Sequence, residues 1–253
     1  MISPSSAAVA ISTGTDTEGA AVRYTSAPRW LDVLPCTGIV TEKLAKLRPG
    51  YRFDVVERTF TMPELAAAIV QALDRPTVLV GHSAGGFPIT AAAEKDPTRI
   101  AALVYLCAYV PQAGQSLAQM RRDGPSQPLA RSFRLNADRT TFTFDPAIAA
   151  DRFYHDCPPH IAAMALSRLT PQPLAPQETA LPATARAKRL PRHYIRCTAD
   201  RTIPPAYQTA MAAGIPVTDL PTGHSPFLAA PEALAQRLSE IAALTLSTGG
   251  LTD

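Results

Sequence analysis

The stretch Thr-Val-Leu-Val-Gly-His-Ser-Ala-Gly-Gly, residues 77–86, predicts a buried strand, a sharp turn and the start of a helix. Its first half is β-branched and apolar, and an Ala-rich segment at 89–95 follows. A serine on so tight a turn adopts a strained backbone, and Gly81 and Gly85 are needed because a Cβ would collide with the neighbouring strand and helix. We predict that the turn leaves the Ser83 hydroxyl exposed above a sheet, and the alternative is a turn without chemistry.

On both sides of this stretch, apolar strand-like segments alternate with helical ones. Segments 7–11 and 20–24 flank a polar, glycine-containing run and predict an N-terminal hairpin. Further strands are predicted at 30–34, 51–57, 101–108, 193–198 and 216–220, and further helices at 40–47, 63–73, 206–213 and 231–242. This alternation predicts an α/β fold with a mostly parallel sheet that helices cover on both faces.

The alternation is interrupted between the strand at 101–108 and the strand at 193–198. We interpret residues 112–189 as an insertion within a single domain that spans 1–253, with helical pieces at 146–154 and 159–169. The insertion also carries a set of apolar side chains, for which two roles are open: to cover a pocket over Ser83, or simply to pack the insertion onto the sheet. The set consists of Phe133, Phe142, Phe144, Phe153, Tyr154, Met164 and Leu169.

A carboxylate and an imidazole follow two successive late strands. Asp200 comes after the strand at 193–198, and His224 after the strand at 216–220. A serine hydroxyl is a weak nucleophile near neutral pH, so it needs a base within hydrogen-bond reach, and that base must be held in one tautomer by a third group. The order Ser83, Asp200, His224 predicts such a triad, while Asp200 as a turn cap without chemistry is the alternative.

The other histidines and one other aspartate are weaker candidates. His82 lies inside the turn with its side chain directed away from Ser83, His155 and His160 lie in the insertion, and His193 begins a strand. Asp219 rivals Asp200 for the acid, although it lies within a strand instead of past its end.

Composition excludes several classes of protein. With 253 residues, 46% of them hydrophobic, the chain can bury one large core. A net charge of +3 from scattered residues, without zinc-ligand spacing, argues against a nucleic-acid partner.

The four cysteines lie far apart and predict reduced thiols. Because we find neither a signal peptide nor a membrane-spanning run, we expect a cytoplasmic protein without a membrane partner; a homodimer is left open.

Three stretches together resemble the α/β-hydrolase superfamily, in particular the branch of plant methylesterases, hydroxynitrile lyases and bacterial small-molecule esterases. They are the turn at 81–86, insertion segments 156–159 and 165–174, and the segment 194–204. The resemblance extends from about residue 40 to the C-terminus. It implies an α/β-hydrolase fold, a small helical lid, no cofactor or metal, and a triad of Ser83, Asp200 and His224.

The chain departs from this branch near its N-terminus. Members usually carry His-Gly after the first buried strand, whereas this chain carries Pro35-Cys36. In the family that segment supplies one of two backbone N–H groups that hold the oxyanion, and the residue after the serine, here Ala84, supplies the other. Aligning the strand ends assigns the first donor to Thr37, with Cys36 as the alternative.

These features predict a carboxylic-ester hydrolase that acts on a small, apolar molecule through an acyl-enzyme on Ser83, with a small-molecule ester as its partner. Two alternatives stay open. One is a lyase or a tailoring enzyme of secondary metabolism on the same fold, and the other is a binding protein without turnover, because a fold alone does not fix function.

Overall fold

The computed structural model describes residues 6–13, 22–23, 61–73, 76–137, 139–169 and 171–248. Within these residues the central sheet has the strand order β2-β1-β3-β4-β8-β9. Four neighbours run parallel: β3 (Thr77–Ser83), β4 (Ile100–Leu106), β8 (Arg192–Cys197) and β9 (Val217–Leu220). The strands predicted at 30–34 and 51–57 and the helix predicted at 40–47 lie outside the described residues.

The other two strands form an antiparallel edge. β1 (Ser6–Thr13) pairs with β2 (Val22–Arg23), which confirms the predicted hairpin. β1 also pairs antiparallel with β3 along its length. This second pairing was not predicted, because the residue pattern of a strand shows which residues are apolar but not which strand lies beside it.

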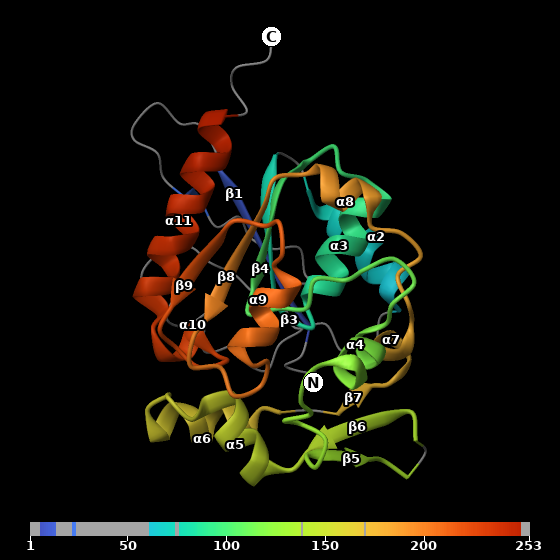
Figure 1. Ribbon diagram of the computed structural model, residues 1–253, viewed down its shortest axis with the longest axis vertical. Coiled ribbons are helices and arrows are strands. Elements are labelled where there is room, and N and C mark those ends of the chain that lie inside the picture. The colour runs from blue at the N-terminus through green and yellow to red at the C-terminus, as the bar shows by residue number, and fades with distance from the viewer. Residues whose placement is uncertain are drawn as a thin grey trace.

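Helices cover both faces of the sheet. Figure 1 shows α11 (Pro231–Thr248) along one face, with α2 (Met62–Ala72), α3 (Gly86–Lys95) and α8 (Ala185–Arg189) on the other. Side chains alternate between these faces. Val78 and Val80 of β3 pack in the cluster that holds Leu234 of α11, while Leu79 packs with Ile69 of α2. Because both faces are buried, β3 and β4 carry continuous apolar runs.

Local chemistry sets where several elements begin and end. The helix predicted at 63–73 begins at Met62 because Thr61 caps it: the Thr61 hydroxyl accepts from Glu64 N, and the Glu64 carboxylate accepts from Thr61 N. β4, predicted to run to residue 108, ends at Leu106 because Cys107 has a positive φ of 34°. Two short helices follow the last parallel strands: α9 (Pro205–Met211) and α10 (Pro226–Ala229).

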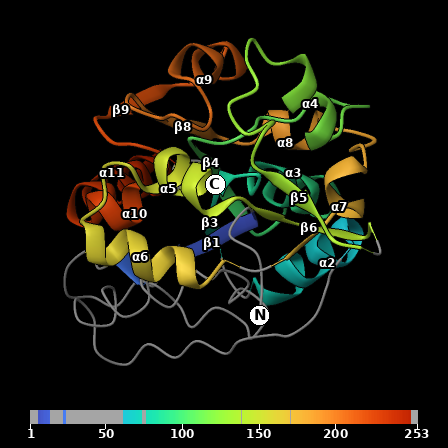
Figure 2. The same ribbon diagram turned by 90° about the horizontal axis from the view of Figure 1, so that it is seen from below.

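The segment between β4 and α8 forms a layer of its own beyond the end of the sheet (Figures 1 and 2). A small antiparallel sheet holds β5 (Phe133–Leu135), β6 (Thr141–Phe144) and β7 (Gln172–Pro173). Four helices accompany it: α4 (Leu117–Asp123), α5 (Pro146–Tyr154), α6 (Pro159–Ser167) and α7 (Ala175–Glu178). An apolar cluster joins these pieces, and in it the rings of Phe144 and Phe153 meet edge to face at 5.1 Å.

Among the helices in the described part of the chain, none combines the length and the apolar content needed to cross a membrane.

Candidate active site

Ser83 lies at the junction of β3 and α3 with a backbone φ of 55°. A positive φ is unfavourable for a residue that carries a Cβ, so the predicted backbone strain at this serine is confirmed. Ser83 is only 8% exposed. The hydroxyl that we predicted to be exposed therefore opens onto a covered cavity instead of bulk solvent, because side chains of the insertion lie over it.

Two glycines permit the close packing around this turn. A Cβ at Gly81 would collide with the backbone carbonyl of Gly85, and a Cβ at Gly86 would collide with the carbonyl oxygen of Tyr109. The sequence predicted collisions at Gly81 and Gly85: the one at Gly81 is confirmed, and the one at Gly85 stays a prediction. Gly86 was not singled out, because the approach of the segment after β4 depends on how that segment leaves the sheet.

The structure brings Ser83, His224 and Asp200 into one hydrogen-bonded line. His224 Nε2 lies 3.0 Å from the Ser83 Oγ, and His224 Nδ1 lies 2.8 Å from Asp200 Oδ2. All three residues are buried. They come from the ends of β3, β9 and β8, which meet at one edge because the strands are parallel.

The hydrogen bonds determine the tautomer of His224. An ionised carboxylate only accepts, so Nδ1 must carry the proton that it donates to Asp200. Nε2 is then the acceptor, and it faces the Ser83 hydroxyl. The imidazole is thus arranged to take a proton from Ser83.

The rival acid, Asp219, lies elsewhere. Its carboxylate accepts from Arg196 Nε at 2.8 Å and from a second guanidinium nitrogen of Arg196 at 2.7 Å, on a half-exposed surface. These hydrogen bonds with Arg196 lower the pKa of Asp219. Asp219 is therefore a partner of a surface arginine and does not contact His224.

A cavity of about 40 Å³ adjoins the Ser83–His224 pair. Its walls are mainly apolar, and Phe144, Phe153 and Tyr154 of the insertion line it beside Ser83. These are three of the seven residues that we expected either to roof a pocket or to pack the insertion. Phe142 is fully buried, and Met164 and Leu169 pack on the insertion cluster, so these three belong to the packing group.

Comparison with known proteins identifies the family. Residues 27–237 match the model of the alpha/beta hydrolase family, which is most of the chain. The chain belongs to the alpha/beta hydrolase family. A solved structure of a pyrethroid hydrolase from Sphingobium faniae JZ-2 superposes with a TM-score of 0.69 at 23% identity, covering 83% of this chain and 93% of that one.

Curated relatives agree with the branch that the sequence resembles. Salicylic acid-binding protein 2 of Nicotiana tabacum is 28% identical over 225 residues, which cover 83% of this chain and 84% of the relative. Methylesterase 17 of Arabidopsis thaliana is 28% identical over 170 residues, which cover 61% and 62%. A pyrethroid hydrolase of Sphingobium wenxiniae is 29% identical over 198 residues, which cover 72% of this chain and 69% of the relative. The resemblance to plant methylesterases and bacterial hydrolases is thereby confirmed.

Of the predicted oxyanion donors, only Ala84 falls in the described part of the chain. Within the turn, Gly85 N donates a hydrogen bond to His82 O, and Phe87 N donates one to Ala84 O. Among the described residues, no hydrogen bond of the turn uses the Ala84 N–H as its donor. Thr37 and Cys36 lie outside the described residues, so the second donor stays a prediction.

Gln208 of α9 is a site residue that sequence reasoning missed. Asp200 Oδ1 accepts from the N–H groups of Thr202 and Ile203, and Asp200 Oδ2 accepts from Gln208 Nε2 at 3.0 Å. Gln208 is fully buried, and its amide also bonds to the N–H of Cys197 and to the carbonyl of Ile203. Nothing in the sequence pattern indicates that a glutamine in this short helix contacts an acid outside it.

We expect Gln208→Met to lower the free energy of unfolding by about 2–3 kcal/mol, because it leaves buried backbone and carboxylate groups without a partner. Thermal or denaturant unfolding measures this change. Gln236→Met is the matched control, since Gln236 is exposed and bonds only to Glu240. Equal stability of the two variants would contradict the role assigned to Gln208.

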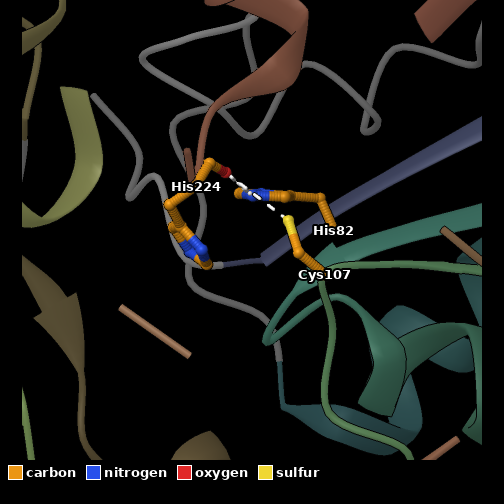
Figure 3. A group of neighbouring side chains, drawn as sticks. All are labelled: His82, Cys107 and His224. Atoms are coloured by element: carbon orange, nitrogen blue, oxygen red, sulfur yellow. Dashed lines mark hydrogen bonds between the residues drawn. The ribbon is translucent and has the colours of Figure 1, made fainter. Parts of the chain in front are cut away.

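Two side chains hold the backbone of His224 in place. His82 Nε2 donates to the His224 carbonyl oxygen at 2.7 Å, and the Cys107 thiol approaches the same oxygen at 3.6 Å (Figure 3). Burial, followed by the electrostatic influence of His224, lowers the pKa of His82 well below its ordinary value, so the His82 ring is neutral. His82 thus supports the loop that carries His224. The orientation of its side chain away from the Ser83 hydroxyl stays a prediction.

His82, Cys107 and His224 also offer ligand atoms that lie within 4.8 Å of one another. Most of their polar atoms are already engaged, and the exception is His82 Nδ1, which is buried without a hydrogen-bond partner among the described residues. His82 Nε2 and Cys107 Sγ converge on a carbonyl oxygen, while both nitrogens of His224 bond to Ser83 and Asp200. The arrangement therefore fits the support of a backbone better than the binding of a metal ion.

The insertion contacts the His224 loop directly. The Gly223 N–H donates to the carboxylate of Asp156, and a Cβ at Gly223 would lie 2.6 Å from Asp156 Oδ1 and 2.6 Å from His155 Cε1. A side chain at Gly223 would therefore displace the side chains of Asp156 and His155. Asp156 belongs to the Asp-Cys-Pro-Pro segment that carries part of the family resemblance, and this contact gives that segment a physical role.

Proposed function

We propose that this chain hydrolyses carboxylic esters of small molecules through an acyl-enzyme on Ser83. The observation that supports the proposal best is the hydrogen-bonded line from Ser83 through His224 to Asp200, at the wall of a small apolar cavity. The curated relatives named as a methylesterase and a pyrethroid hydrolase agree with this chemistry.

In the proposed reaction, His224 Nε2 takes the proton of the Ser83 hydroxyl while Ser83 Oγ attacks the ester carbon. Negative charge gathers on the former carbonyl oxygen, which the N–H groups of Ala84 and Thr37 would receive. His224 then returns the proton to the departing alkoxide, so that an alcohol leaves. A water molecule, activated by the same imidazole, releases the acid and restores Ser83.

The segment 112–189 acts as the lid in this proposal. Three of its aromatic side chains line the cavity beside Ser83, and its Asp156 contacts the His224 loop. A cavity of about 40 Å³ has room for only a few water-sized groups, so we propose that a small part of the substrate, such as a methoxy group, occupies it.

The test is a panel of small esters, including an aryl acetate, assayed together with a serine-directed covalent probe. We expect turnover of at least one ester and a mass increase of one probe adduct, located on Ser83 by peptide mapping. An intact protein that neither turns over an ester nor takes up the probe would overturn the proposal and favour a binding protein.

We also expect no cyanide release from cyanohydrins above background. Hydroxynitrile lyases of this branch carry a lysine directly after the catalytic histidine, and its positive charge receives the cyanide anion. Here the residue is Ser225, which is buried and lines the cavity. The missing charge is worth on the order of a few kcal/mol to a leaving anion in a partly desolvated site.

Ester hydrolysis does not require a positive charge at residue 225, because His224 itself can protonate the leaving alkoxide. A colorimetric cyanide assay beside the ester panel measures both activities. Cyanide release without ester turnover would assign the chain to the lyases.

A further inference from the structure

A second cavity adjoins the one beside Ser83, and Arg121 borders both. The inner cavity measures about 40 Å³ and the outer one about 230 Å³. Tyr109, Arg121, Leu129 and Thr202 line both of them. A molecule with its ester group at Ser83 and a longer remainder in the outer cavity would therefore pass the Arg121 side chain.

The backbone that carries Arg121 is fixed from several sides. Ser116 caps the start of α4, because its hydroxyl accepts from Gln119 N, and the Tyr207 hydroxyl donates to Met120 O at 2.8 Å. The Gln127 side-chain amide donates to the carbonyls of Arg121 and Arg122 at the end of the helix. Arg121 is thus presented from a rigid base instead of a free loop.

The Arg121 guanidinium has no anionic partner at ion-pair distance among the described residues. Its Cζ lies over the Phe133 ring, 4.9 Å from the ring centre. Its N–H groups make no hydrogen bond to any other described residue. Glu178 acts on it only at longer range. Burial is the main influence and lowers the pKa of Arg121, but an arginine keeps its charge at neutral pH.

A partly buried cation without a counter-ion is unfavourable, since desolvation of a charge costs free energy unless a partner compensates it. An anion that arrives with the substrate would supply that partner. Guanidinium matches a carboxylate especially well, because its planar fork can donate two parallel hydrogen bonds. The walls of the inner cavity are mainly apolar, and among the described residues that line it Arg121 is the only arginine or lysine.

We propose that Arg121 binds a carboxylate at the far end of the substrate, so that the substrate class is an ester that also carries an anionic group, such as a half-ester of a dicarboxylic acid. This inference rests on the proposed ester hydrolysis. Arg121 acts as a specificity-determining residue and takes no part in bond making or breaking.

The test compares matched esters. Monomethyl succinate, monomethyl adipate and monomethyl suberate are each paired with the neutral ester in which a methyl group replaces the carboxylate: methyl butanoate, methyl hexanoate and methyl octanoate. We expect at least one half-ester to exceed its neutral partner by roughly 10- to 100-fold in kcat/KM, mainly through KM, as charge-assisted hydrogen bonds allow.

In the Arg121→Gln variant, the ratio of kcat/KM for the half-ester to kcat/KM for its neutral partner should fall close to one. Arg121→Lys should retain part of it, because lysine keeps the charge but lacks the planar fork. Arg131→Gln is the matched control: Arg131 is an exposed arginine of the same insertion that lines neither cavity, so its ratio should equal that of the wild type. If Arg121→Gln does not fold, the Lys variant carries the comparison.

Calorimetric titration with adipate separates this inference from the proposed function. Adipate should bind the wild type and bind Arg121→Gln at least tenfold more weakly. Hydrolysis of neutral and anionic esters at equal rates, or a preference that Arg121→Gln leaves intact, would overturn the inference while the esterase proposal stands. Adipate binding that depends on Arg121, without turnover of any ester, would support the anion site and overturn the esterase proposal.

Discussion

Ser83→Ala is expected to lower kcat for ester hydrolysis by about 10⁴-fold or more, because a triad loses most of its rate when the nucleophile is removed. The loss should fall on kcat and not on KM, since the hydroxyl makes its decisive bond only during the reaction. Steady-state kinetics measure it, with the serine-directed probe as a second readout. The variant should take up no probe at residue 83.

The fold should tolerate this substitution. Alanine is smaller than serine, and the strain at φ 55° comes from a Cβ that both residues share. Ser167→Ala is a suitable control, because Ser167 is exposed and its hydroxyl bonds only to Met164 O. A folded Ser83→Ala variant that kept more than about a tenth of the wild-type turnover would rule out the proposed nucleophile.

Asp200→Asn is expected to reduce kcat by several orders of magnitude, although it changes a single oxygen to nitrogen. The carboxylate of Asp200 accepts from four donors: His224 Nδ1, Thr202 N, Ile203 N and Gln208 Nε2. An asparagine offers only one accepting oxygen and adds a donor. If its NH₂ faces His224, the imidazole proton moves to Nε2 and the acceptor for Ser83 is lost.

If the NH₂ of that asparagine faces Thr202 and Ile203 instead, it meets backbone N–H groups that also donate. Both orientations are therefore unfavourable, and stability should fall together with kcat. Asp219→Asn is the control, because Asp219 pairs with Arg196 on a half-exposed surface where an ion pair contributes at most about 1 kcal/mol. We expect it to change kcat by about tenfold or less. A reversed pair of results would move the acid to Asp219.

Much of the site could be predicted because it depends on positions at strand ends. A buried apolar strand followed by Gly-His-Ser-Ala-Gly indicates where Ser83 lies, and parallel strands place their carboxyl ends at one edge. Asp200 and His224 follow two such strands, so the edge on which they meet follows from the topology alone. The positive φ of Ser83 follows from the same turn.

Other parts could not be predicted, because they depend on which segments pack together. Gln208 reaches Asp200 because α9 folds back against β8, and His82 and Cys107 meet the His224 carbonyl because three loops converge there. Sequence patterns report periodicity and burial along one segment, and they do not report which distant backbone group lies opposite a side chain.

The sequence by itself thus determined the alternation of strands and helices, the strained serine and the residues of the hydrogen-bonded line. Only the tertiary structure decided that Ser83 faces a covered cavity and that Phe144 and Phe153 line it while Phe142 packs in the insertion cluster. It also decided that Arg121 borders both cavities and that none of the described carboxylates lies at ion-pair distance from it. The reason is physical: strand and turn formation is governed by neighbouring residues, whereas the walls of a cavity are set by the packing of segments far apart in the chain.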